Sequence, residues 1–205
     1  LVKQQKLSLT TDIRKYLLTW SFPDNEFSNG KTITISNLLS HTAGLSVHGF
    51  IGYSSIDTLP SINQILDGQR PANNEAVQPI LPPGSQFEYS GGGTTIIRKI
   101  LDDQISTNYD SLMHALVLKP LKMNSSTFSQ PLSSNYTNIA YAYEKDMTVV
   151  NGKYYIYPEQ AAGGLWTTAT DIAKYIIAVQ SALKNKQPAI LNKEGLKSAQ
   201  RFSES

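Results

Sequence analysis

Two serine–lysine pairs are the first residues of this 205-residue chain whose spacing could support chemistry. They are Ser28 with Lys31 and Ser181 with Lys184. At this spacing in a helix, a lysine amine could activate a serine hydroxyl for nucleophilic attack. Ser28 lies in a predicted solvent turn, where nothing would desolvate the lysine and lower its pKa. Ser181 lies near the end of a predicted helix, where the dipole disfavours a developing oxyanion. Neither serine is therefore predicted to be a nucleophile.

The three histidines, His41, His48 and His114, have no metal-ligand spacing, and the chain has no cysteine. The sequence contains no G-x-S-x-G elbow, no H-E-x-x-H motif and no Walker loop. Residues 91–93 are three glycines, but no Lys-Ser or Lys-Thr follows them, so a phosphate cradle is not predicted. We expect no metal and no cofactor. His41 and His114 are assigned structural roles, His41 because it precedes the helix-stopping Gly44.

Composition excludes several other functions. A formal charge of +2 without any basic block argues against nucleic-acid binding. The longest apolar run, residues 175–179, is too short to cross a bilayer. The first residues resemble no signal peptide, so we expect any such leader to lie upstream. The absence of cysteine is consistent with an exported bacterial protein.

The apolar spacing predicts a mostly helical chain in one piece. Helices are expected after Thr11, from Thr34 to before Gly44, over 61–67, over 94–105, over 112–118, after Thr170 and from Asn192. Residues 69–87 contain four prolines and are predicted to be loop. Residues 139–157 alternate like strands, with Asn151-Gly152 as the hairpin turn between them. This hairpin is the only β structure that the sequence predicts.

Four segments in order carry a family resemblance: ITISNLLSHTAGL (33–45), PGSQFEYSG (83–91), PLKMNSST (120–127) and AGGLWTTATD (162–171). In this order and spacing they resemble the serine β-lactamase and penicillin-binding-protein superfamily, specifically its class C-like serine hydrolases. The resemblance covers essentially the whole chain. It implies an α+β, β-lactamase/transpeptidase-like parent fold, of which this chain is mainly the helical lobe with at most a small antiparallel hairpin.

The resemblance also implies roles for particular residues. Tyr89 matches the tyrosine of the family's Y-x-N motif, which brings a phenol oxygen near the nucleophile. Gly91 stands where that motif has asparagine, which puts lactam recognition in doubt and favours the esterase and peptidase branches. His48 matches a region that lines the edge of the pocket, and the backbone of Gly163 and Gly164 is expected to border the pocket. Substrate binding is therefore expected at His48, Gly91, Gly163 and Gly164.

The family's nucleophile belongs to an S-x-x-K helix that precedes a segment like residues 7–13. We therefore expect residues 1–205 to be a partial domain, without the S-x-x-K helix and the C-terminal sheet strands, and to be inactive alone. The function expected of the parent is acyl-enzyme hydrolysis of β-lactams, D-amino-acid peptides or small esters. The alternative is a non-catalytic lobe that binds cell-wall peptide or a protein partner. We expect a periplasmic or secreted location, a small-molecule or peptidoglycan-like substrate, and association with itself or with the rest of the parent.

Overall fold

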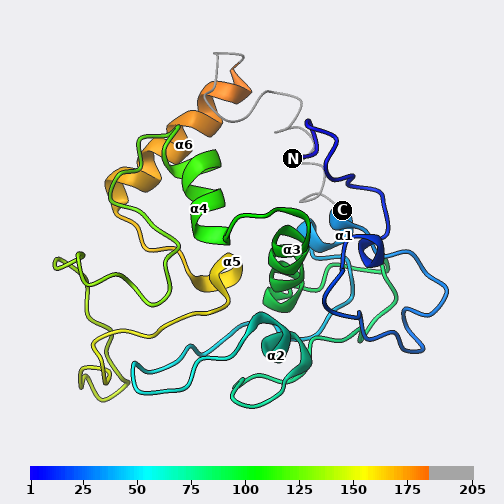
Figure 1. The fold of residues 1–205 in the computed structure, drawn as a ribbon, viewed down its shortest axis with the longest axis horizontal. Helices are drawn as coiled ribbons and strands as arrows, with labels where there is room; N and C mark the ends of the chain where they lie inside the picture. Colours follow the sequence, from blue (N-terminus) through cyan, green and yellow to red (C-terminus); the bar gives the residue numbers. More distant parts are fainter. Residues whose placement is uncertain (185–205) are drawn as a thin grey trace.

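The computed structural model describes residues 1–184, which are mostly helical (Figure 1). The two longest helices are α3 (Gly91–Gln104) and α6 (Ala169–Leu183). The shorter elements are η1 (Ile13–Lys15), α1 (Ile35–Leu39), α2 (Ile62–Asp67), α4 (Tyr109–Met113), the π-helical turn η2 (His114–Leu118) and α5 (Gln160–Gly163). In this part of the chain, β pairing is limited to five isolated antiparallel bridges. The expected mostly helical architecture is confirmed.

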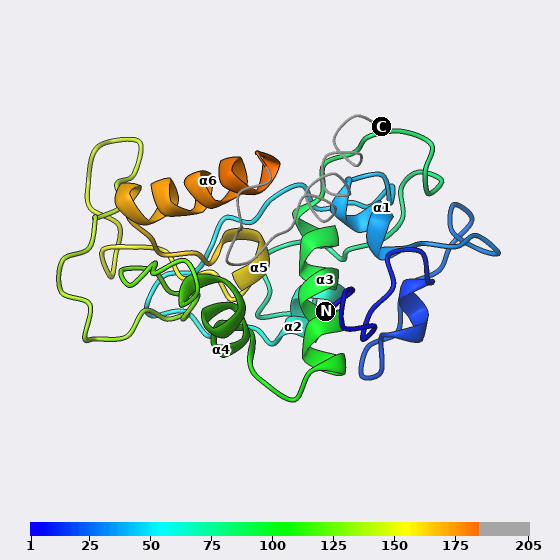
Figure 2. The same ribbon diagram turned by 90° about the horizontal axis from the view of Figure 1, so that it is seen from above.

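Helix α3 lies at the centre of the molecule. Helices α4, α5 and α6 lie on one side of it, and α1 and the N-terminal segment lie on the other (Figure 1 and Figure 2). Its Ile96 and Ile100 are fully buried because apolar positions four residues apart share one helix face. They belong to an apolar cluster with Ile13, Trp20, Ile33, Leu38, Leu45, Leu66 and Val77, among others. Helix α3 thus holds the loop that precedes it against a rigid core.

Side-chain caps start several of these helices at predictable places. Thr34 caps α1 as predicted, and Ser61 caps α2 at the start of its predicted range, each within a reciprocal capping box. Helix α2 ends at Gly68, whose φ of 62° is left-handed. The prediction that Thr170 caps the last long helix was wrong. Thr168 caps α6, because its hydroxyl accepts from the backbone N–H of Asp171 at 3.2 Å.

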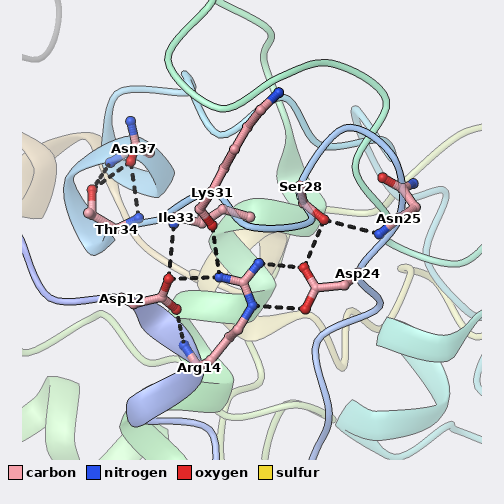
Figure 3. Close-up of polar contacts among 9 residues, drawn as sticks. All are labelled: Asp12, Arg14, Asp24, Asn25, Ser28, Lys31, Ile33, Thr34 and Asn37. Carbon is pink, nitrogen blue, oxygen red and sulfur yellow. Dashed lines mark hydrogen bonds and ion pairs between the residues drawn. The ribbon is translucent and has the colours of Figure 1, made fainter.

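The helix predicted after Thr11 was also wrong, because only the single turn η1 forms there. Arg14 lies between Asp12 and Asp24 and forms ion pairs with both (Figure 3). Further along, the backbone N–H groups of Leu18 and Thr19 donate to the Asp103 carboxylate on α3. These tertiary hydrogen bonds satisfy donors that a continuing helix would have used.

The predicted hairpin over 139–157 is only partly present. Asn151 and Gly152 do form a turn, in which the N–H of Lys153 donates to the carbonyl of Val150 at 2.8 Å. The arm that follows keeps one backbone bond across this turn, in which the carbonyl of Lys153 accepts from the N–H of Ala142 at 2.7 Å. Its Ile156 instead bridges Tyr53, and the local antiparallel bridge joins residues 143 and 149. The hairpin is incomplete because Ile156, on its second arm, pairs with Tyr53 rather than with the first arm.

A second apolar cluster joins α6 to the segment after α4. It contains Tyr109, Leu118, Leu121, Met123 and Phe128, with Ile172 and Ala178 packed against them. The predicted helix over 112–118 is present as α4 and η2, and Pro120 follows it. The middle of α6 is nonetheless partly bare, with Tyr175, Ile176 and Ile177 exposed at 43%, 48% and 61%. The helix predicted from Asn192 lies outside the described residues.

Candidate active site

Tyr89 lies at the end of the loop that leads into α3, and its side chain is 52% exposed. The backbone on either side of it is anchored. Glu88 donates its N–H to the carbonyl of His41 at 2.7 Å. Ser90 is buried and caps α3, since its hydroxyl accepts from the N–H of Gly93 and donates to the carbonyl of Ser46 at 2.6 Å. The phenol therefore faces solvent from a fixed backbone.

His48 holds the carbonyl of Tyr89. Its Nδ1 lies 2.6 Å from that oxygen, and because a carbonyl only accepts, Nδ1 carries the proton and donates. Its Nε2 lies 3.6 Å from a carboxylate oxygen of Glu88. The carbonyl of His48 accepts from the N–H of Gly91 at 3.2 Å. The structure therefore brings together three residues that the sequence nominated, namely His48, Tyr89 and Gly91.

The glycine at position 91 has a physical reason. It is the first residue of α3 and is buried. A Cβ there would lie 3.1 Å from the carbonyl oxygen of His48 and 3.3 Å from the ring of Phe50, closer than most Cβ contacts. An asparagine at this position would press on the His48 segment. Glycine in place of the asparagine of the Y-x-N motif therefore leaves room for the backbone of His48 to lie close to residue 91.

His41 is a site residue that the sequence analysis assigned only to a helix stop. Its ring lies against the ring of Tyr89, with centroids 4.5 Å apart. Its Nδ1 accepts from the backbone N–H of Ser90 at 3.2 Å. Burial lowers the pKa of the His41 imidazole below its ordinary value. No spacing rule in the sequence could reveal this contact, because 48 positions separate His41 from Tyr89.

Gly163 and Gly164 lie elsewhere, at the end of α5. A Cβ on Gly163 would lie 3.2 Å from the ring of Tyr157, and one on Gly164 would clash with Gln160. Gly163 borders a cavity of about 320 Å³ whose walls are mainly aromatic. The other lining residues are Gln130, Ala140, Tyr141, Ala142, Tyr154, Tyr155, Tyr157, Leu165 and Trp166. Within residues 1–184, no hydrogen bond joins either glycine to the Tyr89 group.

The two serine–lysine pairs are not nucleophile sites in this structure. Ser28 lies in a turn as predicted, but its side chain is fully buried rather than solvated, which corrects the sequence analysis. Its hydroxyl donates to Asp24 at 2.8 Å, and the side chain of Lys31 extends away from it (Figure 3). Ser181 lies in the last turn of α6, as expected.

Glu159 is a second residue that sequence reasoning missed. Its carboxyl is fully buried directly before α5, and neither oxygen has a hydrogen-bond partner within residues 1–184. Burial raises the pKa of Glu159 to about 7. The pKa of the Tyr157 phenol is raised mainly by burial, and the negative charge of Glu159 raises it further. An unpartnered buried carboxyl favours its neutral form.

Residues 1–184 contain no group of three or more histidine, cysteine, aspartate or glutamate side chains that could hold a metal ion. None of the helices in that range combines the length and hydrophobicity of a membrane span.

The helical lobe, its glycine-started central helix and the exposed tyrosine before it define a β-lactamase/transpeptidase-like fold. The sequence model of the Beta-lactamase family matches residues 1–203, and the chain belongs to this family. The predicted family resemblance is confirmed. No curated protein sequence matches the chain.

Solved structures share this fold at low sequence identity. The penicillin binding protein from Bacillus halodurans is 20% identical with a TM-score of 0.64, over 96% of this chain and 56% of that chain. The D-amino acid amidase from Ochrobactrum anthropi SV3 is 19% identical with a TM-score of 0.67, over 95% and 52%. A class C β-lactamase is 20% identical with a TM-score of 0.62, over 96% and 48%. The chain spans about half the length of these structures.

Proposed function

We propose that this chain is the tyrosine-bearing lobe of a serine hydrolase that works through an acyl-enzyme. The observation that carries the proposal is Tyr89, an exposed phenol whose backbone is anchored on both sides in a loop that matches the family's second motif. A phenol in such a position can exchange a proton with a bound substrate while its own place stays fixed. Its solvent exposure in this chain leaves room for the reacting groups.

The nucleophilic serine and its lysine are proposed to come from a part of the protein outside these 205 residues. The serine hydroxyl attacks the carbonyl carbon of the substrate, and its proton passes to the lysine. Tyr89 then conducts a proton to the leaving amine or alcohol as the acyl–serine ester forms. Water hydrolyses the ester, which releases the acid and restores the serine.

The substrate class is proposed to be a D-amino-acid peptide or amide, or a small ester, with β-lactams as weaker candidates. Structures of the same fold include a D-amino acid amidase and a D-stereospecific amidohydrolase. Gly91 lacks the side-chain amide of the Y-x-N motif, which removes one group for lactam recognition. The absence of cysteine supports a periplasmic or secreted location, where peptidoglycan-like substrates occur.

The test compares the full-length protein with its Tyr89→Phe variant. Labelled penicillin, fluorophosphonate and activated D-amino-acid esters are the probes, and intact mass reports the acyl adduct. We expect stoichiometric acylation of the wild type. The variant keeps the ring but lacks the hydroxyl, so kcat/KM should fall by about 10²–10⁴-fold. Tyr136→Phe is the matched control, since Tyr136 is also exposed, at 40%.

Two outcomes would contradict the proposal. Full activity of Tyr89→Phe on every substrate that the wild type turns over would remove Tyr89 from the chemistry. Failure of the full-length protein to become acylated by any probe, together with measurable binding of a cell-wall peptide, would favour a non-catalytic binding lobe.

A further inference from the structure

His41 contacts the chain on both sides of Tyr89. Its carbonyl accepts from the N–H of Glu88 at 2.7 Å, and its Nδ1 accepts from the N–H of Ser90 at 3.2 Å. Between these two bonds its ring lies against the Tyr89 ring, with an interplanar angle of 38°. The ring of Phe87 lies on His41 as well, edge to face, with centroids 5.9 Å apart. One residue therefore orients the whole segment that carries the phenol.

The bond to Ser90 requires a particular state of the His41 ring. A backbone N–H only donates, so Nδ1 must be unprotonated and the proton of the neutral imidazole must be on Nε2. Protonated His41 carries hydrogen on both nitrogens and cannot accept this bond. Burial supports the neutral form, since it lowers the pKa of His41.

The backbone of His41 adopts an unusual conformation where its side chain bonds Ser90. Its φ is 55°, a left-handed value that is uncommon for residues other than glycine, although histidine, asparagine and aspartate adopt it more often than the rest. The bond that it makes ends on Ser90, whose hydroxyl caps α3. His41 therefore links the end of α1 to the start of α3 at the position of Tyr89.

We infer that neutral His41 is the positioning residue that orients the Tyr89 phenol, and that its protonation releases Ser90 and disables proton transfer by Tyr89. The inference rests on the proposed function. Three titratable groups lie close to His41 on the segments that pack against it: Tyr89 on its ring, Glu88 through its backbone, and His48 across the Tyr89 carbonyl. Protonation would also place a positive charge against the ring that carries the reacting phenol.

Two substitutions separate the parts of this role in the full-length protein. His41→Asn places an amide oxygen where Nδ1 was, tolerates the left-handed backbone and does not titrate. His41→Phe keeps a ring against Tyr89 but cannot accept the bond. His114→Asn is the matched control, because His114 is exposed on η2, away from the site.

The kinetic expectation is specific. His41→Phe should lower kcat by about tenfold with KM changed less than about threefold. His41→Asn should keep kcat within about fivefold of wild type and shift the acidic limb of kcat/KM to lower pH. His114→Asn should change neither kcat nor the pH of the acidic limb of kcat/KM. In the Tyr89→Phe background, His41→Phe should cause no further loss, since both changes disable one step.

Nitrogen-15 chemical shifts of the His41 ring supply a readout that needs no turnover. We expect the Nε2-protonated tautomer at neutral pH, and we expect the Tyr89 ring and Ser90 amide resonances to shift with the His41 titration. In His41→Asn these shifts should vanish.

Three results would overturn the inference. The first is a wild-type kcat for His41→Phe, and the second is an equal loss of kcat on His41→Phe in the wild-type and Tyr89→Phe backgrounds. The third is a set of Tyr89 resonances that do not shift as His41 titrates. If Tyr89→Phe itself is fully active, the proposed function fails instead. The titration experiment then still decides whether His41 orients Tyr89.

Discussion

Glu159 makes the stability of this protein depend on pH in a direction opposite to that of most carboxyl groups. Its carboxyl is fully buried before α5, and neither oxygen has a hydrogen-bond partner in the part of the chain that the structure describes. The folded pKa of Glu159 is raised to about 7 from 4.5, so the folded state holds its proton more tightly than the unfolded state does. The stabilisation is fully present below pH 4.5 and is lost as the pH rises through 7.

The magnitude follows from the two pKa values. At about 1.36 kcal/mol for each pKa unit, full ionisation of Glu159 costs the folded state about 3 kcal/mol. Between pH 5 and pH 8, linkage predicts a fall on the order of 2–3 kcal/mol in the free energy of unfolding from this group alone. Glu159→Gln keeps the shape of the protonated acid and cannot ionise, so it should remove this fall.

The assay is urea unfolding of the full-length protein at pH 5, 6, 7 and 8, followed by circular dichroism. The quantity that decides is the difference in unfolding free energy between wild type and Glu159→Gln, because the other titrating groups cancel in it. We expect this difference to change by on the order of 2–3 kcal/mol in favour of the variant from pH 5 to pH 8. The control is Glu26→Gln, since Glu26 is exposed. A difference that stays constant with pH would refute the reasoning about Glu159.

Three further predictions concern the site and the surface. The 205-residue chain alone should form no acyl adduct with a chromogenic lactam or an activated ester, and a stoichiometric adduct by intact mass would contradict this. In the full-length protein, His48→Ala should raise KM by roughly threefold or more and change kcat less, since His48 contacts the Tyr89 backbone rather than its hydroxyl. The isolated chain should self-associate through the partly bare middle of α6, and Ile177→Glu should reduce this association because Ile177 is 61% exposed. Light scattering that shows a 22.6 kDa monomer with a cooperative melt would be the contrary result.

The sequence by itself determined the features that depend on neighbouring residues. The caps of α1 and α2 were predictable because Thr34 and Ser61 each bond a residue only three positions away. The same logic could have found Thr168, since Thr-x-x-Asp is a capping pattern and the N–H of Asp171 is its donor. The ordered motif segments were sufficient for the family, and they nominated Tyr89 as the residue to test.

Only the tertiary structure decided the features that depend on distant partners. The predicted N-terminal helix does not continue, because the N–H groups of Leu18 and Thr19 donate to Asp103, more than eighty positions further along the sequence. In the second arm of the predicted hairpin, Ile156 pairs with Tyr53. His41 became a neighbour of Tyr89, and the carboxyl of Glu159 became buried, through contacts that no periodicity encodes. A capping pattern needs only its own turn of chain, whereas the environment of a side chain is set by whatever the folded chain packs against it.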